Sequence, residues 1–275
     1  MTPATLMSWE DAVRWLRAQP ESAELVKACF YDDPLTEAAK RYWQSSEWRA
    51  VGRFLPAARG TALDIGAGRG ISSYALAREG FSVTALEPDP STVVGADAIR
   101  ALAKAADLTI RVVETWGEEL PFAPSSFDLV HCRQVLHHAR DLTQLCRQVG
   151  RVLKPGGVFI ATREHVLSHK KDLTEFLNKH PLHKLYGGEN AYLLREYVEA
   201  ISGSGITLEH TLNPMQSDIN LFPETLLSTK QRWAKKIGLP IASILPDAAL
   251  SLFGSFSSTP GRVYSFVGRK KSTHA

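Results

Sequence analysis

Short runs of β-branched and other apolar residues alternate with helical patterns between residues 61 and 163. The apolar runs are "TALDI" (61–65), "SVTALE" (82–87), "LTIRVVE" (108–114), "FDLVHC" (127–132) and "GVFIATR" (157–163). The helical patterns lie at 71–79, 91–106 and 141–153. Strands separated by helices form repeated βα units that build a parallel sheet, so the sequence predicts an α/β fold.

The segments on either side of this alternating region have different patterns. Residues 1–55 are predicted to form an N-terminal helical cap, and residues 56–275 are predicted to form the main domain. Within the main domain, the polar, histidine-rich stretch 164–190 is predicted to be a substrate loop. The patterns that follow predict, in order, a helix at 191–205, a strand at 206–212, a helical insertion at 213–260 and a last strand at 262–270.

The bulk composition excludes several classes of protein. A net charge of +3 in 275 residues is too small to indicate a nucleic-acid partner. The three cysteines form no C-x-x-C pair, so a disulfide framework is not expected. The longest apolar stretch, 239–256, is interrupted by two prolines and an aspartate, and the N-terminus lacks the apolar core of a secretory signal. We therefore expect a cytoplasmic protein with no integral membrane segment.

Two pairs of histidines have the spacing of metal ligands on a helix. His165 and His169 are four residues apart, and His180 and His183 are three residues apart. Carboxylates and cysteines do not complete a recognisable ligand pattern around them. The sequence therefore predicts no metal site.

The stretch "LDIGAGRG" (63–70) places three glycines directly after the first predicted strand. Glycines at the carboxyl end of such a strand permit positive φ angles and let a ligand approach the backbone closely. The spacing is G-x-G-x-G, and Ile71 takes the place of the third glycine of the nicotinamide fingerprint G-x-G-x-x-G. Glu87 ends the second predicted strand, where a carboxylate can accept hydrogen bonds from both ribose hydroxyls. The pattern favours a nucleoside ligand other than a nicotinamide dinucleotide.

Four segments in order resemble the successive motifs of the class I S-adenosylmethionine-dependent methyltransferases, in the branch that acts on small molecules. They are "ALDIGAGRGISSYALA", "TALEPDP", "GEELPFAPSSFDLVHCRQVLHHARDL" and "GRVLKPGGVFIATRE", which together span roughly residues 55–165. The resemblance implies a Rossmann-like, seven-stranded, mostly parallel sheet whose last strand is antiparallel. It also implies S-adenosylmethionine as the methyl donor.

The resemblance further implies which residues contact this donor. Those around the methionine part are Asp64, Gly66, Ala67 and Gly68, and Glu87 with Pro88 would hold the ribose. Many relatives carry an acid after the third strand for the adenine amino group, and this chain has Trp116 there. We therefore expect adenine to contact Trp116, Gly117 or Glu118, and we expect Arg133 beside the sulfonium.

Histidines follow the fourth and fifth predicted strands, at the edge where catalysis is expected. A hydroxyl acceptor must lose its proton to a group within hydrogen-bond reach, and histidine suits that role near neutral pH. His137 is the first candidate for this base, and His138 is its neighbour in sequence. His165, with Glu164, is the next candidate. The alternative is that one or both of the paired histidines pack against the following helix.

The sequence thus predicts a methyltransferase for a small-molecule acceptor, and we expect O-methylation of a sugar or glycosylated hydroxyl compound. The polar stretch "HKLYGGENAY" (183–192) favours this acceptor, whereas the apolar stretch 239–256 favours a quinone, a lipid-like compound or a polyketide. A non-catalytic S-adenosylmethionine-binding protein is a further alternative. A nicotinamide oxidoreductase is disfavoured by the glycine spacing. Nothing in the sequence predicts an oligomeric state.

Overall fold

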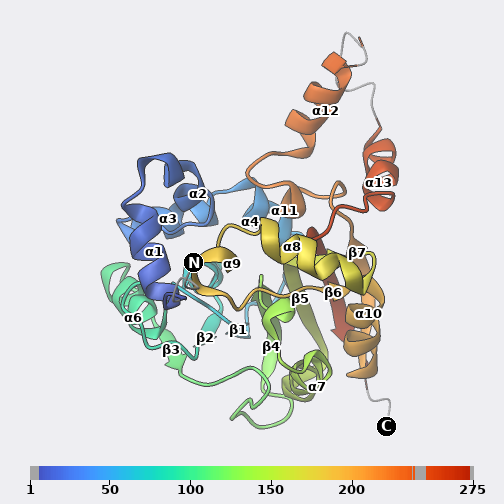
Figure 1. Cartoon of the computed structure of the whole chain (residues 1–275). Coiled ribbons are helices and arrows are strands. Elements are labelled where there is room, and N and C mark those ends of the chain that lie inside the picture. The colour runs from blue at the N-terminus through green and yellow to red at the C-terminus, as the bar shows by residue number, and fades with distance from the viewer. Residues whose placement is uncertain (1–5, 237, 239–245, 273–275) are drawn as a thin grey trace.

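The computed structural model describes residues 6–236, 238 and 246–272. One mixed sheet runs through the middle of the protein, with helices on both faces (Figure 1). The strand order is β3-β2-β1-β4-β5-β8-β7, and the short strand β6 pairs with β5. The strands are β1 (Thr61–Ile65), β2 (Ser82–Leu86), β3 (Ile110–Val113), β4 (Phe127–Arg133), β5 (Leu153–Leu167), β6 (Tyr192–Leu193), β7 (Ile206–Leu212) and β8 (Arg262–Lys270).

Strands β1 to β5 are parallel, and β8 runs antiparallel between β5 and β7. This confirms the predicted Rossmann-like α/β fold with an antiparallel last strand. The predicted seven strands form the main path of the sheet. The two-residue strand β6 is additional, because residues 192 and 193 pair with the end of β5 before helix α10 (Leu194–Gly203) begins.

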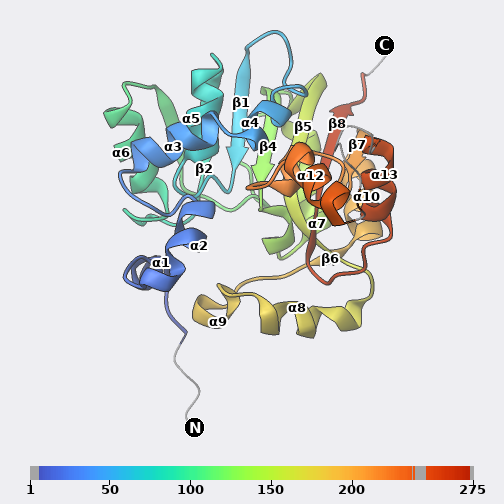
Figure 2. The ribbon, with the colours of Figure 1, turned by 90° about the horizontal axis from the view of Figure 1, so that it is seen from above.

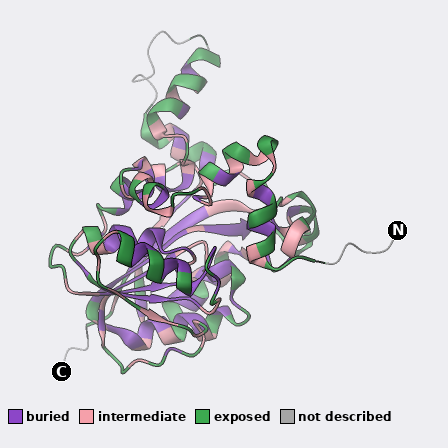
Figure 3. Ribbon diagram, turned by 90° about the vertical axis from the view of Figure 1, so that its left-hand side faces the viewer, coloured by how far each residue is buried: buried purple, intermediate pink, exposed green. Residues whose placement is uncertain are grey.

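Two hydrophobic cores lie on opposite faces of the sheet. One packs the strands against α7 (Leu142–Val152) and α10. The other packs them against α3 (Leu35–Trp43), α4 (Ser46–Val51), α5 (Ile71–Arg78), α6 (Ala96–Ala105) and α11 (Asp218–Leu221). The buried strands at the centre of Figure 3 show this arrangement. Because both faces are covered, the strands read as nearly continuous apolar runs.

Helices α1 (Trp9–Arg17), α8 (Leu173–Lys179) and α9 (His183–Tyr186) lie beyond one end of the sheet (Figure 2). Apolar side chains of α1, of α2 (Ala23–Ala28) and of the segment around α9 form a small common cluster. Residues 164–190 therefore differ from the predicted loop, since they contain the end of β5 and two helices. The division into a cap at 1–55 and a main domain remains a prediction.

The predicted helical insertion contains α11, α12 (Leu226–Lys236) and α13 (Asp247–Ser255). Figure 1 shows α12 projecting away from the sheet. Most of the first half of the apolar stretch 239–256 lies outside the described residues. Among the helices that the structure does describe, not one has the length and apolar character needed to cross a membrane.

Candidate active site

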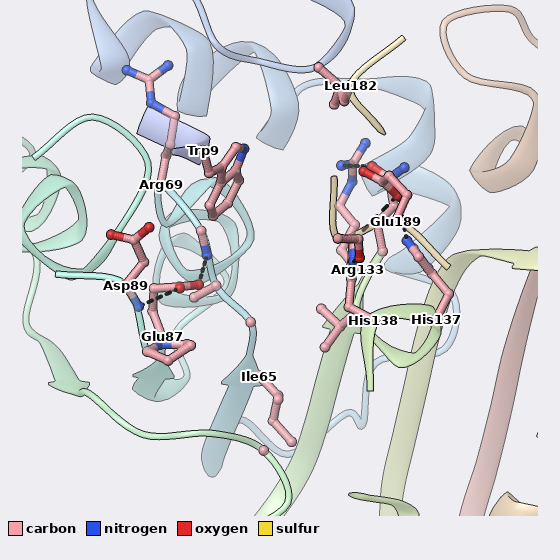
Figure 4. A pocket seen from close by; sticks show the side chains of 18 of the residues that line it. Trp9, Ile65, Arg69, Glu87, Asp89, Arg133, His137, His138, Leu182 and Glu189 are labelled. Atoms are coloured by element: carbon pink, nitrogen blue, oxygen red, sulfur yellow. Dashed lines mark hydrogen bonds and ion pairs between the residues drawn. The ribbon is translucent and has the colours of Figure 1, made fainter. Parts of the chain in front are cut away.

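A cavity of about 800 Å³ opens at the carboxyl ends of the parallel strands. Its wall comes from the loops after β1 to β4, from His165 of β5, from the N-terminal segment and from residues 180–189. Ligands bind at this edge in open α/β sheets, and the volume suits a cofactor together with a small molecule. Figure 4 shows two sides to the cavity, with Glu87 and Asp89 on one and His137, His138 and Glu189 on the other.

The loop after β1 is shaped by left-handed glycines. The φ angles of Gly66, Gly68 and Gly70 are 61°, 54° and 83°. A Cβ atom on Gly66 would lie 2.6 Å from a methyl carbon of Val135, so the loop has no room for a side chain there. Gly66, Ala67 and Gly68 all line the cavity. This backbone can therefore be approached closely by a ligand.

Asp64 lies beneath this loop and is not part of the cavity wall. Its buried carboxylate accepts hydrogen bonds from the hydroxyls of Ser72 (2.8 Å) and Ser73 (2.6 Å) and lies 2.9 Å from Nδ1 of His131. The sequence-based expectation was that Asp64 borders the ligand. In the structure its oxygens are instead occupied by these partners, which fix the start of α5 and thereby the glycine loop.

Glu87 follows β2 and lines the cavity beside Pro88. Its Oε2 accepts a hydrogen bond from the N–H of Gly68 (2.8 Å), and its Oε1 accepts one from the N–H of Asp89 (3.0 Å). Burial raises the pKa of Glu87 to about 7, and these two N–H groups offset only part of that effect. A carboxylate offers about four acceptor positions, so two remain for a ligand's hydroxyls.

Trp116, Gly117 and Glu118, which the family resemblance assigns to adenine, line the cavity after β3. The Trp116 ring is 56% exposed, and the guanidinium carbon of Arg140 lies 4.9 Å from its centre. Glu118 accepts a hydrogen bond from the backbone N–H of Arg140 (3.0 Å). A Cβ atom on Gly117 would lie 2.6 Å from Leu145. The segment offers an aromatic face and closely packed backbone to a flat ligand.

Arg133 ends β4 and reaches the N-terminal helices. Its Nε and Nη2 donate to the two carboxylate oxygens of Glu47 at 2.7 Å and 3.0 Å, while the rings of Phe30 and Tyr42 lie within 5.5 Å of its guanidinium carbon. Burial acts to lower the pKa of Arg133, but Glu47 more than offsets it and the pKa is raised. The ion pair is neutral as a unit, so a cationic ligand can lie beside it.

Sequence reasoning missed the contribution of the N-terminal segment to the cavity wall. The ring of Trp9 lies over the glycine loop, 3.5 Å from where a Cβ on Gly68 would be. Arg69 donates to the carbonyl oxygens of Phe30 (2.9 Å) and Asp32 (3.0 Å) and so ties the loop to this segment. The only signal for Trp9 was the helical pattern itself, which does not indicate what the helix covers.

His137 lies in the short 3-10 helix Leu136–His138 and is buried against β5. Its Nδ1 lies 2.7 Å from Oε2 of Glu164, which also accepts the backbone N–H of His137 (3.1 Å). Because a carboxylate accepts, Nδ1 carries the proton and Nε2 is left with a lone pair. Burial lowers the pKa of His137 well below its usual range, with a further contribution from His138. The imidazole is therefore neutral at physiological pH.

His165 and His138 also use Nδ1 for a hydrogen bond, in both cases to a backbone carbonyl. Nδ1 of His165 donates to the carbonyl oxygen of Gly261 (2.8 Å), and Nδ1 of His138 donates to that of Gly188 (3.0 Å). Burial lowers the pKa of His165 to about 3. All three histidines line the cavity, so the structure brings the predicted catalytic candidates together.

Glu189 faces these histidines from the segment that follows α9, and sequence reasoning did not single it out. Its Oε2 lies 3.8 Å from Nε2 of both His137 and His138, and its Oε1 lies 3.8 Å from Nδ1 of His180. Burial acts to raise the pKa of Glu189, but His138 and His180 beside it, with the hydrogen bond from the Tyr186 hydroxyl, outweigh burial and the pKa is lowered. The carboxylate is thus ionised at neutral pH.

The comparisons with known proteins agree with this geometry. Residues 63–161 match the family model described as a methyltransferase domain. The chain is 32% identical over 160 residues to the ubiquinone biosynthesis O-methyltransferase of Paracidovorax citrulli (strain AAC00-1), an alignment covering 53% of this chain and 63% of that one. It is 32% identical over 124 residues to the uncharacterized methyltransferase YcgJ of Bacillus subtilis (strain 168), covering 42% and 45%. The chain thus spans about half the length of the curated relatives it matches.

A solved structure extends the likeness in fold. The geranyl diphosphate C-methyltransferase of Streptomyces coelicolor A3(2), in complex with Mg²⁺, geranyl diphosphate and S-adenosyl-L-homocysteine, aligns with a TM-score of 0.60 at 15% identity. The alignment covers 94% of this chain and 88% of that one, which shows a shared fold. The matched domain and the shared fold together support a class I S-adenosylmethionine-dependent methyltransferase.

Proposed function

We propose that this chain is a methyltransferase that transfers the methyl group of S-adenosylmethionine to a hydroxyl of a small molecule. One observation carries the proposal: neutral histidines with free Nε2 atoms share a cavity with the glycine loop and Glu87. When bound, S-adenosylmethionine supplies a methyl group on a positively charged sulfur, which is already electrophilic. The protein then has to align the acceptor and receive its proton.

The residues around the glycine loop fit the donor. The backbone at Gly66 and Gly68 would take the methionine part, and the free acceptor positions of Glu87 would take the ribose hydroxyls. Trp116 and Gly117 would contact adenine. The neutral pair of Arg133 with Glu47 would lie beside the sulfonium without repelling it.

On the opposite side of the cavity, His137 would activate the acceptor. Glu164 holds the Nδ1 proton, which leaves the lone pair of Nε2 facing the cavity. The acceptor's proton would pass to this nitrogen as its oxygen takes the methyl group, and the electrons of the broken C–S bond would remain on sulfur. His165 adds a second neutral ring within 4.6 Å of His137, between ring centres.

The acceptor class is proposed from the groups beside the histidines. Glu189 and the hydroxyls of Tyr31 and Tyr186 favour a polyhydroxylated acceptor such as a sugar or a glycosylated compound. The likeness to ubiquinone biosynthesis O-methyltransferases supports a second candidate, a hydroxyl on a hydrophobic quinone precursor. Leu25, Phe30 and Leu182 in the same wall would suit that acceptor.

The proposal is tested by incubating the full chain with S-adenosylmethionine and a panel of sugars, glycosides and phenols, with mass spectrometry of the products. We expect a mass increase of one methylene on a hydroxyl compound, together with formation of S-adenosylhomocysteine. Binding of S-adenosylhomocysteine without turnover of any panel member would favour the non-catalytic alternative.

The pKa of Glu87 makes the affinity for S-adenosylhomocysteine depend on pH. Ribose hydroxyls donate to the ionised carboxylate, whereas below pH 7 a proton competes with them. We therefore expect binding about tenfold weaker at pH 6 than at pH 8, as linkage requires for one group titrating near 7.

Calorimetric titration at both pH values measures this effect, and Glu87→Gln is the matched control because it keeps the shape of the side chain and removes its titration. The variant should bind more weakly at pH 8 and show little pH dependence. A wild-type affinity that is constant between pH 6 and 8 would contradict the assignment of Glu87 to the ribose.

A further inference from the structure

Three side chains from distant parts of the sequence converge at the histidine side of the cavity. One ligand atom of each of His137, His165 and Glu189 lies within 4.8 Å of the other two, and all three residues are buried. They come from the loop after β4, from within β5 and from the segment after α9. Figure 4 shows the His137 ring directed toward Glu189. Two imidazoles and one carboxylate are a common ligand set for a divalent transition metal.

Each of these side chains is held by a second partner. Nδ1 of His137 is bound by the carboxylate of Glu164 (2.7 Å), and Nδ1 of His165 by the carbonyl of Gly261 (2.8 Å). Oε1 of Glu189 accepts a hydrogen bond from the hydroxyl of Tyr186 (2.7 Å). Such partners fix the tautomer and orientation of metal-binding side chains. They also leave Nε2 of both histidines and Oε2 of Glu189 free for another partner.

The ligand atoms that face one another here form no hydrogen bond with each other. Nε2 of His137 lies 3.8 Å from Oε2 of Glu189, which is too long for a hydrogen bond. Nε2 of His138 lies at the same distance from that oxygen. A cation between Nε2 of His137 and Oε2 of Glu189 would give both atoms a partner. Two ligands on one tetrahedral zinc are about 3.4 Å apart, so the His137–Glu189 pair would contract by about 0.4 Å and no pair by more than about 1.4 Å.

We propose that His137, His165 and Glu189 bind one divalent transition metal ion, of the Zn²⁺ or Fe²⁺ class, which leaves coordination positions open toward the cavity. The nitrogen-rich ligand set favours such ions over Mg²⁺ and Ca²⁺, which prefer oxygen ligands. The sequence predicts no metal site because the spacing of neighbouring histidines forms no recognisable ligand pattern. These three residues are far apart in sequence, so no spacing could reveal the site.

The role of the ion rests on the proposed methyl transfer, whereas its binding does not. An acceptor hydroxyl on an open position would have a lowered pKa, as water has on zinc. Its proton would pass to Nε2 of His138, which is part-exposed and lies beside Glu189. The resulting oxygen anion would form the bond to the methyl carbon while the C–S electrons remain on sulfur. His137 would then act as a ligand, and the ion would take over the activation.

The test is metal binding by the full, tag-free chain after removal of metals with a chelator. Zn²⁺ is titrated against a chromophoric chelator, and Co²⁺ is added to record its visible absorption. We expect one ion per chain and a Co²⁺ spectrum typical of a low coordination number. His165→Ala and Glu189→Gln should weaken Zn²⁺ binding by at least about 100-fold, and Glu164→Gln by about 10–100-fold.

His210→Ala is the matched control, because His210 is exposed on β7 and should leave Zn²⁺ binding unchanged. Thermal unfolding and S-adenosylhomocysteine binding check that each variant is folded. If wild type and His165→Ala bind Zn²⁺ with equal affinity, the proposed metal site is wrong. This conclusion holds even if the protein binds S-adenosylhomocysteine and transfers methyl groups. If Zn²⁺ binds as expected but neither S-adenosylhomocysteine binding nor methyl transfer is found, the proposed function fails and the ion site stands.

Discussion

Replacement of His137 by alanine is expected to lower the single-turnover rate of methyl transfer by about 10²–10⁴-fold, the range for a positioned proton acceptor. The variant loses the Nε2 lone pair that faces the acceptor, whether that lone pair acts directly or through a bound ion. The affinity for S-adenosylhomocysteine should remain nearly unchanged, because the glycine loop and Glu87 lie on the other side of the cavity. Rapid quenching with the donor saturating measures the rate.

His210→Ala controls for the loss of a histidine outside the cavity and should keep the wild-type rate. The pH profile is a second check. Burial lowers the pKa of His137, so this residue stays unprotonated in mildly acidic solution. The wild-type rate of methyl transfer should therefore fall only at a pH well below the pKa of an ordinary histidine. An unchanged rate in His137→Ala would remove this residue from the mechanism and leave His165 as the next candidate.

Replacement of Gly66 by valine should weaken S-adenosylhomocysteine binding by about 100-fold or more. The left-handed conformation (φ 61°) costs a residue with a Cβ about 1–2 kcal/mol, and the approach to Val135 at 2.6 Å adds overpacking of about 1–3 kcal/mol. A change of 1.4 kcal/mol corresponds to a tenfold change in affinity, so about 3 kcal/mol of strain and overpacking in the binding loop corresponds to binding about 100-fold weaker.

Gly156→Val is the matched control for backbone strain. Gly156 also has a positive φ (74°), but a Cβ atom there meets nothing within 4 Å. The control should lose stability in thermal unfolding and still bind S-adenosylhomocysteine like wild type. A folded Gly66→Val protein that binds with wild-type affinity would show that the loop after β1 does not contact the donor.

The sheet could be predicted because each of its central strands is a short apolar run between helical patterns. The same reasoning failed at residues 164–190, where a polar sequence was interpreted as a loop although β5 continues to Leu167 and α8 follows. Pairing with β8 extends that strand, and β8 lies about 100 residues further along the chain. A local pattern cannot indicate such a partner.

The place of the glycine loop and of Glu87 on the cavity wall was predictable from motifs, since both follow from their positions after β1 and β2. Asp64 shows the limit of this reasoning, because the sequence places it correctly at the end of β1 and does not show that serines and a histidine occupy its oxygens. Glu189 and Trp9, which also line the cavity, lie far from the motifs in the sequence. Only the folded chain brings them to the cavity.

The most direct test of the central claim is calorimetry of the full chain with S-adenosylhomocysteine and, on the same preparation, with NAD. The account predicts one binding site for S-adenosylhomocysteine and no heat of binding with NAD, because in the proposed site the G-x-G-x-G loop takes the amino-acid part of the ligand and Glu87 takes its ribose. Heat of binding with NAD and none with S-adenosylhomocysteine would contradict it.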